Sequence, residues 1–120
     1  MAGAHFIEHK GKKILHLDFA GCKSAELAKI IPEAKAMIGK EPNGSVRTLT
    51  DVTDMEVTKE TSATIKDFTT FNKPYVIAGA VVGVTGLKKV IYNAIVAISG
   101  RNMSTFDTID QAKDWLATQT

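Results

Sequence analysis

The chain has 120 residues, of which 44% are hydrophobic and 23% charged, a composition typical of a globular domain with one core. Its formal net charge of +2 is too small to indicate nucleic-acid binding, and its longest apolar runs, 75–82 and 90–98, are too short to span a membrane. The single cysteine excludes an internal disulfide and fits a reducing compartment. We therefore expect one cytoplasmic domain over residues 1–120, without a signal peptide.

Residues 5–19 predict a β-hairpin. Gly11 provides the turn between two apolar runs. On the second strand Leu15, Leu17 and Phe19 share one face, whereas Ile14, His16 and Asp18 share the other. This alternation indicates one buried face and one more exposed face.

Residues 24–39 have the spacing of an amphipathic helix. Ser24 is a suitable N-cap, and Gly39 is a suitable stop. The apolar side chains at helical spacing are Leu27, Ile31, Ala34 and Ile38. Because Pro32 lacks a backbone N–H, we expect a kink or a break near Ile31.

The central part of the chain predicts two strands and a helix. Residues 45–52 form a short strand, and a loop follows it. The helix in the later part of 53–72 turns Ile65 and Phe68 inward. Residues 73–84 are apolar without alternation, which is typical of a central strand covered on both faces.

Residues 87–99 predict a further helix. Thr85 is a suitable N-cap for it, and Gly100 is a suitable C′ residue after its end. Its expected inward stripe consists of Leu87, Val90, Ile91, Ala94 and Ile98. Residues 103–107 then predict a short last strand.

The closing helix, residues 109–119, begins with a capping box of Thr108 and Gln111. The side chains that it turns inward are Ala112, Trp115 and Leu116. The element order is β-β-α-β-α-β-α-β-α, so the fold class is α/β. Because strands and helices alternate after the hairpin, the five-stranded sheet should be mostly parallel with an antiparallel first strand. The alternation within strands two and three predicts helices mainly on one face.

The element order and three stretches of sequence resemble the SpoIIAA-like family of the STAS domain superfamily. The stretches are the hairpin around Gly11, the strand ending in TDVTD, and the run VVGVTGLKKVIYNAIVAISGRNMSTFDTIDQAKDWL over residues 81–116. The resemblance covers about residues 5–118. It implies a β/α core with sequentially ordered strands and a domain that is non-enzymatic and either regulatory or ligand-binding.

By the same resemblance, the segment after the third strand contains candidate phosphorylation sites. The best-understood relatives are anti-sigma-factor antagonists, which switch on phosphorylation of a serine at the start of a helix. The hydroxyls in the corresponding segment are those of Thr53, Thr58, Thr61 and Ser62. The acidic residue at the strand end, Asp51, is present, but the Ser-Ser-Gly segment of those switches is absent, which counts against a phospho-switch.

The stretch GVTGLKK, residues 83–89, joins a predicted strand to a predicted helix. It contains neither the dinucleotide-binding pattern G-x-G-x-x-G nor a P-loop. Free amides at a helix N-terminus beside two lysines form a general site for an anionic or lipid-like ligand. The candidate residues are Gly83, Thr85, Gly86, Lys88 and Lys89. Alternatively, the glycines only permit a close junction and both lysines are solvated.

The helix predicted over 87–99 has more apolar surface than one packing face requires. The residues that widen its apolar arc are Ile95, Val96 and Ala97. This surface is either buried under neighbouring elements or covered by a lipid, a protein partner or a second copy of the chain. The three residues are therefore candidates for contact with a partner.

Two further sets of residues carry potential chemistry. If residues 10–11 form the hairpin turn, His5 lies opposite His16, and Asp18 shares the His16 face, which would suit a transition metal. No ligand motif accompanies them, so we interpret them as polar residues on an open sheet face and predict no metal and no cofactor. Cys22 precedes a helix, which could lower its pKa, but no base is tied to it, and we interpret it as a small loop residue.

Because no catalytic constellation is present, we interpret the chain as a non-enzymatic domain that works by binding. The expected partner is a small anionic or lipid-like ligand, a regulatory protein, or a second copy in a homodimer. No nucleic acid and no transmembrane segment are expected. The alternative hypothesis is a phospho-regulated switch of the anti-sigma-factor-antagonist type.

Overall fold

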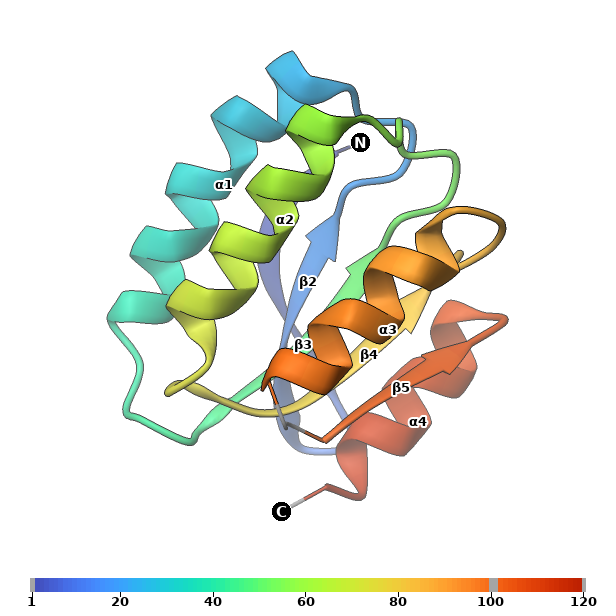
Figure 1. Ribbon diagram of the computed structural model, residues 1–120. Coiled ribbons are helices and arrows are strands. Elements are labelled where there is room, and N and C mark those ends of the chain that lie inside the picture. The colour runs from blue at the N-terminus through green and yellow to red at the C-terminus, as the bar shows by residue number, and fades with distance from the viewer. Residues whose placement is uncertain (1, 100–101, 120) are drawn as a thin grey trace.

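The computed structural model of the chain describes residues 2–99 and 102–119, and the elements in these ranges follow the predicted order (Figure 1). The strands are β1 (Gly3–His9), β2 (Lys12–Asp18), β3 (Val46–Asp51), β4 (Val76–Val82) and β5 (Met103–Phe106). The helices are α1 (Ser24–Gly39), α2 (Lys59–Asn72), α3 (Lys88–Ser99) and α4 (Ile109–Ala117). Gly100, the expected C′ residue of α3, lies outside the described residues. None of the described helices is long and apolar enough to cross a membrane.

The five strands lie in sequential order in one sheet. β1 pairs antiparallel with β2, and every later neighbour pair is parallel, as the alternation of elements predicts. Lys10 and Gly11 form the hairpin turn with φ values of 52° and 77°, the left-handed conformation that a two-residue turn requires. This turn sets the register in which His5 faces His16, which confirms the predicted pairing.

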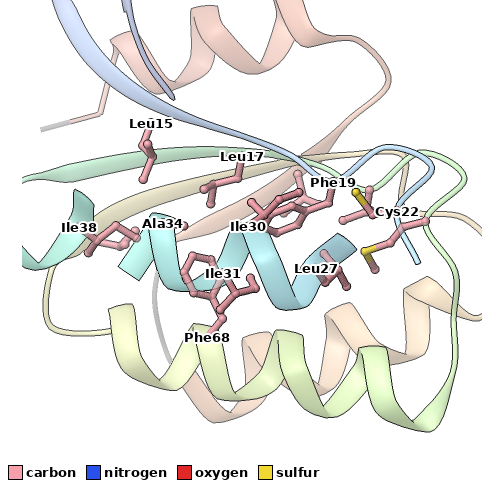
Figure 2. Packing of buried hydrophobic residues seen from close by; sticks show 14 of the residues in the cluster. Leu15, Leu17, Phe19, Cys22, Leu27, Ile30, Ile31, Ala34, Ile38 and Phe68 are labelled. Atoms are coloured by element: carbon pink, nitrogen blue, oxygen red, sulfur yellow. The ribbon is translucent and has the colours of Figure 1, made fainter. Parts of the chain in front are cut away.

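Three helices, α1, α2 and α3, cover one face of the sheet, and α4 covers the other, so the prediction of helices mainly on one face is confirmed (Figure 1). The larger core lies under α1 and α2, where Leu15 and Leu17 of β2 and Phe19 directly after it meet the inner sides of both helices (Figure 2). The smaller core lies under α4 and includes Ile14, Leu49, Ala80 and Leu116. The alternation of β2 thus supplies side chains to both cores.

In α2 and α4, the side chains that pack into the core are those that the sequence predicted to point inward. Phe68 of α2 is buried, and its ring packs edge-to-face on Phe19 at 6.2 Å between centroids. Ile65 packs against the same core. In α4, Ala112 and Leu116 are fully buried.

α1 runs as one helix through Pro32, so of the expected kink or break near Ile31 the break is wrong, and the kink stays a prediction. Pro32 is exposed, and the carbonyl that it leaves without a helical partner belongs to Ala28, which is also exposed. Water can hydrate that carbonyl, which lowers the cost of the missing hydrogen bond. The N-cap is Lys23, one residue before the predicted Ser24.

α3 is rotated about its axis relative to the prediction. Leu87 and Val90, which were expected in the inward stripe, have exposed fractions of 70% and 68%. Ile95, assigned above to the outer arc, is buried, whereas Val96 is half-buried and Ala97 is exposed. The side chains that α3 turns inward are Lys88, Ile91, Tyr92 and Ile95. Because α3 is apolar on almost every side, periodicity alone does not determine which side faces the sheet.

Candidate functional site

A cavity of about 80 Å³ lies between α2, α3 and the sheet, and it is partly open to solvent. Figure 1 shows the two helices side by side above the strands that form its floor. Its lining is mostly apolar and includes Leu17, Phe19, Phe68, Ile91, Tyr92 and Ile95. Burial raises the pKa of Tyr92, so this phenol remains protonated at neutral pH.

Small residues on the sheet leave this space under α3. Thr48 and Thr50 of β3 both line the cavity at positions where the neighbouring strand β2 presents Leu15 and Leu17. Gly79 of β4 faces the same side, since a Cβ there would lie 3.2 Å from Thr48 Oγ1 and 3.6 Å from Met103 Cγ. Among the helices, α3 rests mainly against α2. Therefore α3 covers the sheet without closing fully onto it.

One end of the cavity is polar and positively charged. Ser62 in the first turn of α2 and Lys88, the first residue of α3, both line it. Helices that follow parallel strands begin at the same edge of a sheet, so the positive ends of both helix dipoles lie at this end. An anionic group placed there would face two helix N-termini and the Lys88 ammonium group.

The turn before α3 lies directly against the loop after β3. Gly83 has a φ of 88°, and a Cβ at this position would lie 2.6 Å from the backbone nitrogen and 2.7 Å from the Cα of Thr53. Only glycine allows both this conformation and this approach. The structure therefore brings together two segments that the sequence singled out separately, the anion-binding candidate and the phosphorylation candidate.

The first backbone amides of α3 are already paired. The N–H groups of Lys88, Lys89 and Val90 each donate, at 3.1 Å, to the carbonyl three residues earlier. They are therefore less available to a ligand than the sequence suggested. The two lysines also differ: the side chain of Lys88 lines the cavity, whereas Lys89 is exposed. Gly86 and Thr85 are exposed in the turn.

The four candidate phosphorylation sites have different surroundings. Thr53 and Thr58 are exposed, and Thr58 is the N-cap of α2, where its Oγ1 accepts from the Thr61 backbone at 3.0 Å. Thr61 is only 1% exposed, and its hydroxyl donates to the Glu56 carbonyl at 2.8 Å. Ser62 is half-buried beside the cavity.

The histidine pair lies on the α4 side of the sheet. The rings of His5 and His16 meet edge-to-face at 4.9 Å between centroids. Burial, and after it the charge of His5, lowers the pKa of His16, while Asp18 and Asp51 act weakly in the opposite direction. Nε2 of His16 is buried, and no described group hydrogen-bonds to it. Within residues 2–99 and 102–119, no three His, Cys, Asp or Glu side chains are placed to hold a metal ion.

Cys22 is fully buried in the larger core (Figure 2). Burial raises the pKa of its thiol, and the charges of Glu26 and Asp18 raise it further. The suggestion that the helix N-terminus lowers this pKa is therefore wrong, because desolvation of the thiolate is the larger effect.

Sequence reasoning did not identify the cavity. The signal that could have found it is the face of β3 opposite α4, where Val46, Thr48, Thr50 and then Val52 alternate with residues that face α4, such as Leu49. Two threonines on a strand face that is otherwise apolar indicate a place where the core is not filled by hydrocarbon.

A comparison with solved structures identifies the fold. The chain is similar to the crystal structure of an uncharacterized protein of the DUF3478 family from Shewanella loihica PV-4, described as having a SpoIIAA-like fold. The TM-score is 0.78 at 12% sequence identity, and the alignment covers 97% of this chain and 95% of that one. No family model and no curated protein matches the sequence. The chain therefore has a SpoIIAA-like fold, as the sequence resemblance implies.

Proposed function

We propose that this SpoIIAA-like fold serves as a non-enzymatic binding domain for a small amphipathic anion. The ligand has an apolar body, which occupies the cavity, and a carboxylate or similar group, which pairs with Lys88. The observation that carries the proposal is the cavity lining: apolar side chains surround most of it, and Lys88 is the charged residue among those that line it.

The size and charge of the cavity define the class of ligand. A volume of about 80 Å³ has room for on the order of five water molecules, so it suits a short alkyl chain or one end of a longer chain. Burying alkyl carbon against Phe68, Ile91 and Ile95 supplies affinity through the hydrophobic effect. An anionic end group completes an ion pair with Lys88, whereas a cationic end group would be repelled.

The two neighbouring lysines provide a matched test. Purified protein is titrated with hexanoate and, separately, with hexylamine, which has the same chain length and the opposite charge. Hexanoate should bind more tightly, and Lys88→Gln should weaken hexanoate binding by roughly tenfold or more, the loss expected for a charge-assisted hydrogen bond. Lys89→Gln removes the same charge from an exposed position and should leave the affinity unchanged. Equal binding of the two amphiphiles, or equal losses in the two variants, would refute the proposal.

The alternative function, a phospho-regulated switch, has one favourable observation. Thr53 in the loop after β3 and Thr58 at the N-cap of α2 are both exposed, and a phosphate on Thr58 would face the positive end of the helix dipole. Phosphopeptide mapping of the protein isolated from its native cells tests this function. Phosphate on Thr53 or Thr58 would support it, and unmodified peptides under all growth conditions would count against it.

A further inference from the structure

The outer surface of α3 is apolar at its N-terminal end. Leu87 and Val90, within one turn, leave 70% and 68% of their surface exposed, the two highest values among the large hydrophobic residues described. Lys89 lies between them in the sequence and is also exposed. Together they form a small apolar patch at this end of the helix.

Two lysines, Lys88 and Lys89, stand between these apolar residues in the sequence. Lys88 and Lys89 form no ion pair within the described part of the chain. The apolar pair is thus accompanied by two lysine ammonium groups that no described carboxylate pairs with.

We propose that α3 and the turn before it dock on an anionic lipid bilayer. Leu87 and Val90 insert at the boundary between headgroups and acyl chains, and Lys89 pairs with lipid phosphate or carboxylate groups. This combination of protruding apolar side chains and flanking lysines is how interfacial helices bind membranes. A symmetric contact between two copies of the chain fits less well, because it would bring the same lysines of both copies together.

The docking surface and the cavity lie on opposite sides of the same helix. Ile91, Tyr92 and Ile95 face the cavity, whereas Leu87 and Val90 face away from it. Docking would therefore place the cover of the cavity at the bilayer. The proposal does not depend on the proposed function, because the docking residues are not those that line the cavity.

Vesicle sedimentation tests docking directly. Large vesicles of two parts phosphatidylcholine to one part phosphatidylserine are compared with vesicles of phosphatidylcholine alone. The variants are the double substitution Leu87→Ser with Val90→Ser, the charge reversal Lys89→Glu, and its control Lys29→Glu. Lys29 is exposed on α1, which α2 separates from α3 (Figure 1). Circular dichroism establishes that each variant keeps its fold.

Wild-type protein should sediment with the anionic vesicles and much less with the neutral ones. The double variant and Lys89→Glu should each lower partitioning by about tenfold or more, and Lys29→Glu should leave it unchanged. Equal partitioning of all four proteins, or an equal loss in both lysine variants, would overturn the proposal. It is also overturned if the protein binds no vesicles and light scattering shows a dimer that the double variant separates into monomers.

Discussion

Gly83 is the contact point between the turn before α3 and the loop after β3, and its replacement by alanine has a cost that the structure allows us to work out. At a φ of 88°, any residue other than glycine is strained, at a cost of about 1–2 kcal/mol. The added Cβ would also lie 2.6 Å from the Thr53 backbone nitrogen. Because backbone atoms cannot rotate away, this overpacking costs a further 1–3 kcal/mol or so. Gly83→Ala should thus lower the free energy of unfolding by about 2–5 kcal/mol.

Gly86 provides the matched control for this substitution. Its φ is 58°, but no atom lies within 4 Å of the position that a Cβ would take. Gly86→Ala should therefore show only the conformational cost of about 1–2 kcal/mol. In urea denaturation, with a slope of about 2 kcal/mol per molar, the Gly83→Ala midpoint should fall below that of Gly86→Ala by about 1 M. Equal midpoints for the two variants would show that the close approach to Thr53 does not constrain the fold.

Three further outcomes follow from individual side chains. Burial and the raised pKa of Cys22 predict that a thiol reagent modifies native protein far more slowly than urea-unfolded protein, and equal rates would contradict this. Because burial and His5 lower the pKa of His16, the unfolded state takes up this proton first, and stability should fall as pH drops through about 6.5 towards the lower folded-state pKa. In thermal melts at a series of pH values, the Tm of His16→Leu should fall less steeply over this pH range than the Tm of the wild type. An equally steep fall in the two proteins would refute the assignment of the effect to His16. A hydrogen bond with His9 lowers the pKa of Asp114. Any stabilisation by the ionised Asp114 is therefore present at neutral pH and is lost as pH falls through the lowered pKa. Calorimetry should find that Asp114→Asn changes Tm at neutral pH but not in acid.

The features of the fold that the sequence predicted correctly follow from local patterns that are compatible with only one structure. The alternation in β2 placed Leu15 and Leu17 on one buried face, and the turn at Lys10 and Gly11 fixed the pairing of His5 with His16. The opposite face of β2, expected to be more exposed, is instead covered by α4, and Ile14 on it is fully buried. Since the parallel strands follow one another through helices, the order of the sheet followed from the order of elements.

The incorrect predictions concern features that depend on tertiary surroundings. Pro32 suggested a break, but the sequence does not show that the carbonyl it leaves without a partner is on the solvent side. Cys22 precedes a helix, but burial in the core determines its pKa. The rotation of α3 was undetermined because apolar residues occur on almost every side of this helix. The cavity was missed because its lining comes from α2, α3 and the sheet, and the sequence alone does not place these side chains together.

The most direct test of the account is the position of hexanoate bound to the protein, measured by intermolecular NOEs with a carbon-labelled ligand. We expect the methyl end of the chain to contact Phe68 and Ile91 inside the cavity. The methylene group next to the carboxylate should contact the side chain of Lys88, with the carboxylate about 3 Å from Nζ. Contacts confined to Leu87 and Val90 on the outer surface of α3, or to His16 on the far face of the sheet, would contradict the assignment of the cavity as the binding site.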